Sequence, residues 1–250
     1  MSSDILTISL KDRAISFLWQ HLLLTVSLFI MTFGVALSVR SALGSSVIST
    51  IPFVMMLAGD DGRAPAFTIG EYTYIMNAIL VFCQILILRR RFHPAQLFQL
   101  IIGFLFGFLL DINVWLTSGL PVDTLLSRVV MQISGCIVLA IGIAFEIRCG
   151  SVTMPGEGIS VAVSCAYKMP FPKAKIIVDC LLVGIAVLLG YLFFNEWKWE
   201  VVGPGTLFAM IFVGAAVRFI DPHLKWFSQV LAYRPGFRRY LFGLARLFRN

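Results

Sequence analysis

Residues 16–39 read SFLWQHLLLTVSLFIMTFGVALSV, a run of 24 residues without a charged side chain. A helix needs about 20 mostly apolar residues to cross the hydrocarbon layer of a bilayer. The apolar core of a secretory signal peptide is shorter, roughly 7–15 residues. The stretch therefore predicts a permanent transmembrane helix, and it decides how the rest of the chain is interpreted.

The composition of the whole chain agrees with a membrane protein. Hydrophobic residues make up 59% of the 250 residues and charged residues 13%, with a mean hydropathy of +0.90. Soluble domains carry about 25% charged residues. A soluble domain, a disordered chain and a nucleic-acid-binding domain are therefore disfavoured, despite a net charge of +7. The expected partner is the lipid bilayer and not nucleic acid.

Six segments are long and apolar enough to span a membrane, which predicts an all-α integral membrane protein. They are Ser16–Val39, Tyr72–Leu88, Leu97–Leu116, Val129–Phe145, Ile176–Phe194 and Val201–Ile220. The corresponding units are an N-terminal segment, a first three-helix unit, a connector, a second three-helix unit and a tail, at residues 1–15, 16–116, 117–128, 129–221 and 222–250.

The basic residues are distributed unevenly between the two sides of these spans. With a cytoplasmic N-terminus, 16 of them fall inside and four outside. Cytoplasmic loops of membrane proteins carry the excess of Lys and Arg. We therefore expect both termini to be cytoplasmic. The tail mixes aromatic residues with Arg238, Arg239, Arg246 and Arg249, which favours a basic amphipathic helix on the inner leaflet. A cytoplasmic partner docked at the tail, or a homo-oligomer, is the alternative.

Two further apolar segments, residues 41–59 and 149–167, follow the first and fourth spans. The first contains Gly44-Ser45-Ser46 and Pro52, and the second contains Pro155-Gly156-Glu157-Gly158. If both crossed fully, the basic residues would divide 14 to 6 and Arg89–Arg91 would lie outside. Interrupted or re-entrant segments fit the charge distribution better. Full spanning stays open at this point.

The two three-helix units resemble each other. GVALSVR at 34–40 aligns with GIAFEIR at 142–148 at an offset of 108, and Ile69-Gly70-Glu71 aligns with Phe171-Pro172-Lys173 at 102. Asp111 matches Asp221 at an offset of 110. Because each unit holds three spans, the second would enter the membrane inverted, as in many secondary transporters. An old duplication without a transport role is the alternative.

The two interrupted segments are the predicted binding region. Irregular backbone at membrane depth must be buried in protein or face water, and free N–H groups at a helix start attract anions. An arginine precedes each interruption, and the pair would approach a central cavity and hold an anionic group. The candidate substrate-binding residues are Arg40, Gly44, Ser45, Ser46, Arg148, Pro155, Gly156, Glu157 and Gly158. Snorkelling of the arginines, with Glu146 or Glu157 pairing Arg148, is the alternative.

Asp179 is a carboxylate inside a predicted span, so it should face protein or water. Lys175 lies one helical turn earlier on the same face, and Asn77 is the equivalent of Asp179 in the first unit. These three residues are candidates for ion coupling or for a buried polar cluster. A structural Lys175–Asp179 ion pair is the alternative.

Signatures of other chemistry are missing from the sequence. GxxxxGK[ST], GxSxG and HExxH do not occur, and the five cysteines show no CxxC spacing. We therefore expect no enzyme activity, no catalytic residues, no cofactor, no metal site and no disulfide framework.

The sequence resembles the YczE/YyaS/YitT-type bacterial integral membrane proteins. The resemblance rests on Gly34 and Arg40 to Ser46, on Pro155 to Ile159, and on Pro172, Lys175 and Asp179, and it covers Phe17 to about Asp221. It implies a bacterial cytoplasmic (inner) membrane protein of unsettled role. Many relatives have a proline where this chain has Val47, so the first interruption is expected to be softer than the second.

Taken together, the residues favour a transporter or permease for a small anionic or zwitterionic solute, working by alternating access between inverted halves. The alternative is a membrane scaffold without transport, or an accessory or substrate-binding subunit of a larger complex, in which the polar residues only lock the bundle.

Overall fold

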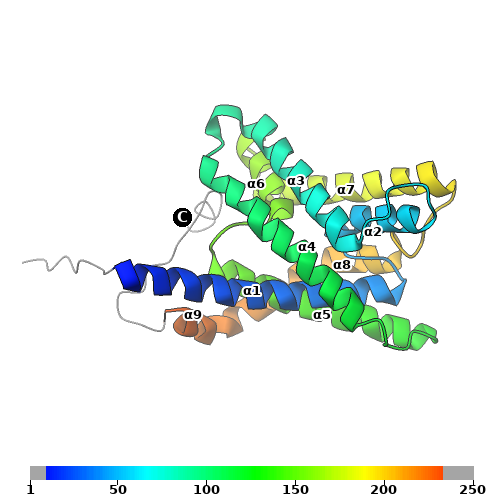
Figure 1. Cartoon of the computed structure of the whole chain (residues 1–250), viewed down its shortest axis with the longest axis horizontal. Coiled ribbons are helices and arrows are strands. Elements are labelled where there is room, and N and C mark those ends of the chain that lie inside the picture. Colours follow the sequence, from blue (N-terminus) through cyan, green and yellow to red (C-terminus); the bar gives the residue numbers. More distant parts are fainter. Residues whose placement is uncertain (1–9, 233–250) are drawn as a thin grey trace, which may run out of the picture.

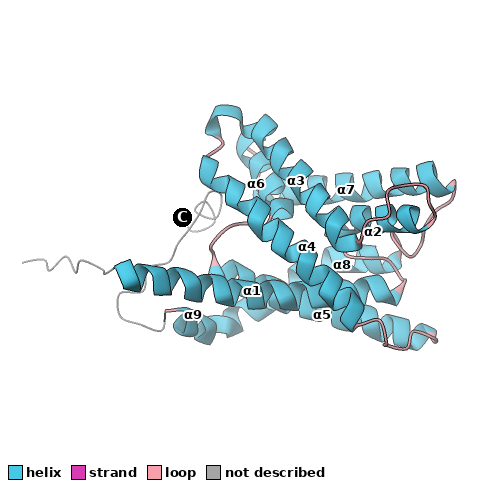
Figure 2. Cartoon of the chain, in the orientation of Figure 1, coloured by secondary structure: helices cyan, strands magenta, loops and turns pink. Residues whose placement is uncertain are grey.

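The computed structural model describes residues 10–232, which fold into helices joined by short loops, with no strand in that range (Figure 1, Figure 2). The helices are α1 (Leu10–Ser41), α2 (Val47–Asp60), α3 (Ile69–Leu88), α4 (Phe98–Leu116), α5 (Leu125–Cys149), α6 (Pro155–Tyr167), α7 (Phe171–Phe194), α8 (Pro204–Ile220) and α9 (Lys225–Leu231). Three 3₁₀ turns complete them, at Arg89–Arg91, Pro94–Leu97 and Asp221–Leu224.

Six of these helices, namely α1, α3, α4, α5, α7 and α8, are long and apolar enough to cross a membrane. Each contains most or all of one predicted span, so the prediction of an all-α, multi-pass membrane protein is confirmed. The helix ends differ from the predicted ones by a few residues. The largest changes are at the starts of α1 and α7, where the helix begins before the predicted span.

α2 and α6 are half-helices. At about 1.5 Å per residue, their 14 and 13 residues reach about 20 Å, which is short of the roughly 30 Å hydrocarbon layer. The breaks that precede them, residues 42–46 and 150–154, are equally long. Ala42 and Gly44 have positive φ in the first break, and Gly150 has it in the second. Both interruptions are thus complete breaks, and in the first one two residues with positive φ end α1 without a proline.

The crossing of α1 and α5 is the most extensive contact between two helices in residues 10–232. Gly34 of α1 faces the backbone of Gly135 and Leu139, and Gly142 of α5 faces the backbone of Met31. Glycine is required here because the two backbones approach too closely for any side chain. The repeated motif that the sequence shows at Gly34 and Gly142 is therefore the central contact of the fold.

The remaining helices pack in corresponding ways around this crossing. α4 lies on α1 as α8 lies on α5, α2 contacts α3 and α7, and α6 contacts α7 and α3. One correspondence fails. α3 and α4 pack closely along their length, whereas α7 and α8 make few contacts with each other. A cavity occupies the space between α7 and α8.

A buried amide joins the first break to the second unit. The Gln132 Oε1 atom accepts hydrogen bonds from Ser38 and Ser41, and its Nε2 donates to the Gly205 carbonyl at 2.9 Å. The Gly205 N–H donates in turn to Leu43 at 2.8 Å. Gln132 is buried, so these bonds fix the end of α1 against α5 and the start of α8.

We expect Gln132→Leu to lower the free energy of unfolding by about 1–3 kcal/mol, because Ser38, Ser41 and the Gly205 carbonyl each lose a buried hydrogen bond that joins α1, α5 and α8. Thermal unfolding of the purified protein in detergent measures this. Gln96→Leu is the matched control, since Gln96 is also buried but its Oε1 has no hydrogen-bond partner within residues 10–232. Equal losses in both variants would contradict the structural role of Gln132.

The described part of the C-terminal tail packs on the bundle. In α9, Phe227 and Leu231 are buried, and the Phe227 ring lies 4.6 Å from that of Phe145. The segment from 222 to 232 is therefore held by the protein, which differs from an independent helix on the leaflet. The remainder of the predicted amphipathic tail lies outside the described residues.

Candidate functional site

The cavity between α7 and α8 has a volume of about 360 Å³. α7 contributes one wall, α8 the opposite wall, and the starts of α2 and α6 form the inner end. Its polar lining residues are Ser46, Glu157, Lys175 and Asp179, and its glycines are Gly156 and Gly214. The rest of the lining is apolar. A hollow of this size with a few convergent polar groups is typical of a small-molecule site.

Two half-helix N-termini point into this cavity. Val47 begins α2 and Gly156 lies in the first turn of α6, and both line the space. First-turn N–H groups have no intrahelical acceptor and carry the positive end of the helix dipole. Neither start is capped by a side chain, whereas α3 and α5 have full capping boxes. The free donors at α2 and α6 are therefore available to an anionic group.

Three charged side chains share the cavity with these helix starts. The Lys175 Nζ atom donates to Asp179 Oδ1 at 2.7 Å, one turn along α7. Glu157 of α6 lies close enough to feel both charges, but it forms no ion pair within residues 10–232. The cavity thus holds one carboxyl group that is paired with a lysine and one that has no ion pair in the described chain.

Several candidate residues lie beside the cavity in structural roles. Ser45 donates to the Val201 carbonyl through both its N–H and its hydroxyl. A side chain at Gly44 would meet Gly203 and Thr206 of the α8 start. These two residues therefore anchor the first break on α8. Ser46 alone of the first motif lines the cavity.

The second motif is divided in the same way. Gly156 and Glu157 line the cavity. The Pro155 carbonyl accepts a hydrogen bond from Gln84, and Gly158 leaves room for the side chains of Gln84 and Gln99. Pro155 and Gly158 therefore support the start of α6 from the side of α3 and α4.

The remaining candidates are Arg40, Arg148 and Asn77, and none of them lines the cavity. Arg148 pairs with Asp221 at 2.8 Å, and not with Glu146 or Glu157 as the sequence allowed. Asn77 is fully buried on α3 against Gly103 of α4, with both polar side-chain atoms unpartnered within the described chain. It lies in a packed seam, whereas its equivalent Asp179 faces the cavity.

Sequence reasoning missed a buried pair of amides. Gln84 of α3 and Gln99 of α4 are both fully buried and exchange hydrogen bonds of 3.2 and 3.3 Å. Each stands among apolar residues in its helix, and no sequence pattern distinguishes it from Asn77 or Asn113 on the same two helices. They position α6 through the bond to Pro155.

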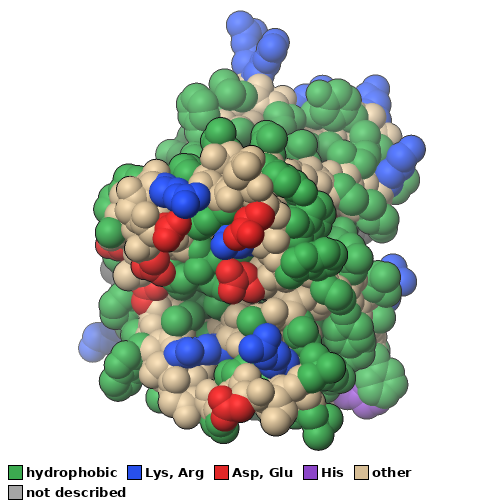
Figure 3. Space-filling model, turned by 90° about the vertical axis from the view of Figure 1, so that its right-hand side faces the viewer, with side chains coloured by type: hydrophobic (Ala, Val, Ile, Leu, Met, Phe, Trp, Pro, Cys, Tyr) green, Lys and Arg blue, Asp and Glu red, His purple; other side chains and the backbone are tan. Residues whose placement is uncertain are grey.

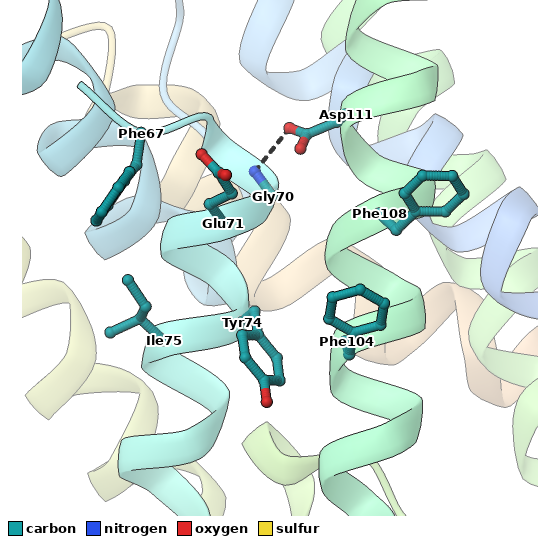
Figure 4. A pocket seen from close by; sticks show the side chains of 8 residues that line it. All are labelled: Phe67, Gly70, Glu71, Tyr74, Ile75, Phe104, Phe108 and Asp111. Atoms are coloured by element: carbon teal, nitrogen blue, oxygen red, sulfur yellow. Dashed lines mark hydrogen bonds between the residues drawn. The ribbon is translucent and has the colours of Figure 1, made fainter. Parts of the chain in front are cut away.

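A second hollow of about 420 Å³ lies on the outer flank of α3 and α4 (Figure 4). Its lining residues are Phe67, Gly70, Glu71, Tyr74, Ile75, Phe104, Phe108 and Asp111. Asp111 Oδ1 accepts from the Gly70 N–H at 2.8 Å, and Oδ2 accepts from Thr68 Oγ1 at 2.6 Å. Asp111 therefore fastens α4 to the start of α3.

The two ends of the bundle differ in charge. We call the end where α1 begins and α5 finishes the basic end, and the other the opposite end. The opposite end shows acidic and basic side chains together, ringed by hydrophobic ones (Figure 3). There Lys198 donates to Glu196 at 2.6 Å, and this hydrogen bond lowers the pKa of Glu196 from its ordinary value. The cavity extends toward the basic end, where Ile147, Phe171 and Val217 line it.

The fold and the site define a multi-pass helical membrane protein with two half-helices that begin at one internal cavity. The chain belongs to a family of unknown function, DUF6198, which matches residues 18–222. No curated protein and no solved structure matches it. The match covers all eight helices from α1 to α8 except the first turns of α1.

Proposed function

We propose that the protein is a secondary transporter or permease for a small solute, bound in the cavity between α7 and α8. The observation that carries the proposal is that two uncapped half-helix starts and three charged side chains converge on one hollow. Substrate sites of secondary transporters lie near the bilayer midplane at the starts of interrupted helices. Inverted three-helix halves and cytoplasmic termini belong to this proposal. Membership of the YczE/YyaS/YitT type stays a prediction.

The charges of the cavity favour a zwitterion over a simple anion. An anionic group of the solute would accept from the first-turn N–H groups of Val47 and Gly156. A cationic group would pair with Glu157, whose carboxylate has no ion-pair partner in the described chain. A simple anion would leave Glu157 unpaired and repelled, which costs free energy at this depth. The Lys175–Asp179 pair would take the role of ion coupling.

The unequal packing of the two units supports alternating access. The cavity is open between α7 and α8, while the equivalent helices α3 and α4 are closed on each other. This asymmetry is expected of a transporter that is open toward one side. Its two inverted halves have different conformations, and they exchange these conformations when access alternates. In the proposed orientation the basic end is cytoplasmic, and the described conformation opens inward.

A thermal-shift panel on the purified protein tests the proposal. Amino acids, betaines, dicarboxylates and inorganic phosphate are added singly, and a ligand that binds only the folded state raises Tm. We expect a zwitterion to raise Tm by several degrees and to enter vesicles that contain the protein. Glu157→Gln should remove the shift, whereas Glu196→Gln, an exposed carboxylate at the opposite end, should keep it.

The alternative function, a scaffold or accessory subunit, predicts a different outcome. No solute would shift Tm, and one cytoplasmic protein would co-purify in stable stoichiometry. The apolar character of most of the cavity lining favours neither outcome, but the unpaired Glu157 and the uncapped helix starts favour transport.

A further inference from the structure

An ion pair fastens α8 to α5 at the basic end. Arg148 Nε donates to Asp221 Oδ1 at 2.8 Å, and Arg148 NH1 donates to Ser228 Oγ at 3.0 Å. The guanidinium also donates to the Asp221 carbonyl. The Arg148 side chain is only 17% exposed. Charge-assisted bonds of this kind are among the stronger polar contacts in proteins.

The equivalent residues at the opposite end, Arg40 and Asp111, form no ion pair within residues 10–232. Asp111 instead accepts from Thr68 and from the Gly70 N–H at the start of α3, a bond visible in Figure 4. Arg40 has a buried Nε atom without a hydrogen-bond partner in residues 10–232. The same Arg and Asp positions, repeated at offsets of 108 and 110, are thus used in two different ways.

The contact that each aspartate makes goes with a different packing of the two helices beside it. Where Asp111 binds the start of α3, α3 and α4 are in close contact, and a side chain on Gly107 would collide with the Gly70 carbonyl. Where Asp221 holds Arg148, α7 and α8 are apart. The equivalent of Gly107 at the offset of 110 is Val217, which lines the open cavity.

We propose that the two Arg–Asp pairs are exchangeable locks of the two gates. When the opposite end opens, Asp111 leaves Thr68 and Gly70 and pairs with Arg40. When the basic end closes, Asp221 leaves Arg148 and binds the start of α7. This inference rests on the proposed transport function, because it assigns the residues that alternate access to the cavity.

The donors that Asp221 would bind at the start of α7 differ from those that Asp111 binds at the start of α3. Pro172 stands where α3 has Gly70, so it offers no N–H to Asp221. The exposed ammonium of Lys173, in the first turn of α7, is a donor at that place. Each gate state leaves one arginine without its aspartate, and the two states therefore stay close in free energy, as alternating access requires.

Distances between spin labels test the exchange without any added solute. The protein is reconstituted in nanodiscs after Cys83, Cys136, Cys149, Cys165 and Cys180 are replaced by serine or alanine. One label pair reports the opposite end, at Ile75 of α3 and Leu126 of α5. Another reports the basic end, at Leu18 of α1 and Ile177 of α7. All four side chains are exposed in the structure.

Arg148→Gln should weaken the described state alone. We expect the ratio of the two populations to change about tenfold or more, the scale of one lost charge-assisted contact. The Ile75–Leu126 distance should lengthen as the Leu18–Ile177 distance shortens. Arg40→Gln should leave both distances as they are, because it weakens only the other state. Arg63→Gln, which removes an exposed ion pair with Asp61, is the control.

A charge swap distinguishes loss of the ion pair from misfolding of the variant. Arg148→Asp combined with Asp221→Arg should restore the distances of the unmodified protein. Unchanged distances in Arg148→Gln, or movement of both ends in the same direction, would overturn the exchange. If the protein takes up solute but the label distances do not change in Arg148→Gln, the exchange of Arg–Asp pairs is rejected and the transport function stands. If the two label distances change in opposite directions but no solute binds, the transport function is rejected.

Discussion

Gly34→Val is expected to abolish the folded protein. The added side chain would overlap the backbone of α5 at Gly135 and Leu139, whose atoms lie within 3 Å of the position of a Cβ. Backbone atoms cannot turn aside as a flexible side chain can. Overpacking in a core costs about 1–3 kcal/mol when neighbours adjust, and we expect more here because the central crossing would have to separate.

The measurement is the yield of monodisperse protein after detergent extraction, followed by thermal unfolding of what is recovered. Gly184→Val on α7 is the matched control, since nothing lies within 4 Å of a Cβ at that position. It makes the same change of residue on another helix that is long enough to span the membrane. A well-folded Gly34→Val protein, as stable as Gly184→Val, would show that the α1–α5 crossing is described wrongly.

Gly156→Leu is expected to weaken solute binding at least a hundredfold while the fold survives. Gly156 lies in the first turn of α6 and lines the cavity, and within residues 10–232 the only side-chain atoms near the position of an added Cβ belong to Ile48 of α2. The end of an isoleucine can move, so the cost in stability is small. The leucine would occupy the space between the two helix starts, where the anionic group of the solute is proposed to lie.

The binding assay is the thermal shift produced by whichever zwitterion stabilises the unmodified protein. Gly184→Leu again provides the control, because it adds the same side chain away from the cavity. Binding retained in Gly156→Leu would place the solute elsewhere. Loss of binding in both variants would indicate a general effect of added bulk.

The sequence predicts the membrane architecture well because bilayer thickness and hydropathy are local constraints. The charge-free run at 16–39, and Gly and Pro at the two interruptions, locate spans and half-helices without any tertiary information. The same patterns place Ser46, Gly156, Glu157, Lys175 and Asp179 near one another, and the structure puts all of them on the cavity.

Contacts between distant segments could not be predicted in this way. Arg148 has two acidic residues close by in sequence, but its partner Asp221 is 73 positions away. Ser45 and Gly44 have the residue types of a binding motif, yet tertiary packing uses them to hold α8. Gln84 and Gln99 give no distinct signal, because each shares its helix with another amide, Asn77 or Asn113, and none of these amides changes the hydropathy of its span enough to stand out.

The most direct test of the central claim is the accessibility of Ser46 from the two sides of the membrane. Ser46→Cys, in the cysteine-free background, is exposed in oriented vesicles to a membrane-impermeant thiol reagent applied from one side or the other. Ser46 lies at the inner end of the cavity and is buried. The account predicts modification from both sides, slowed by a bound zwitterion. Modification from neither side, or from one side only, would contradict alternating access to this cavity.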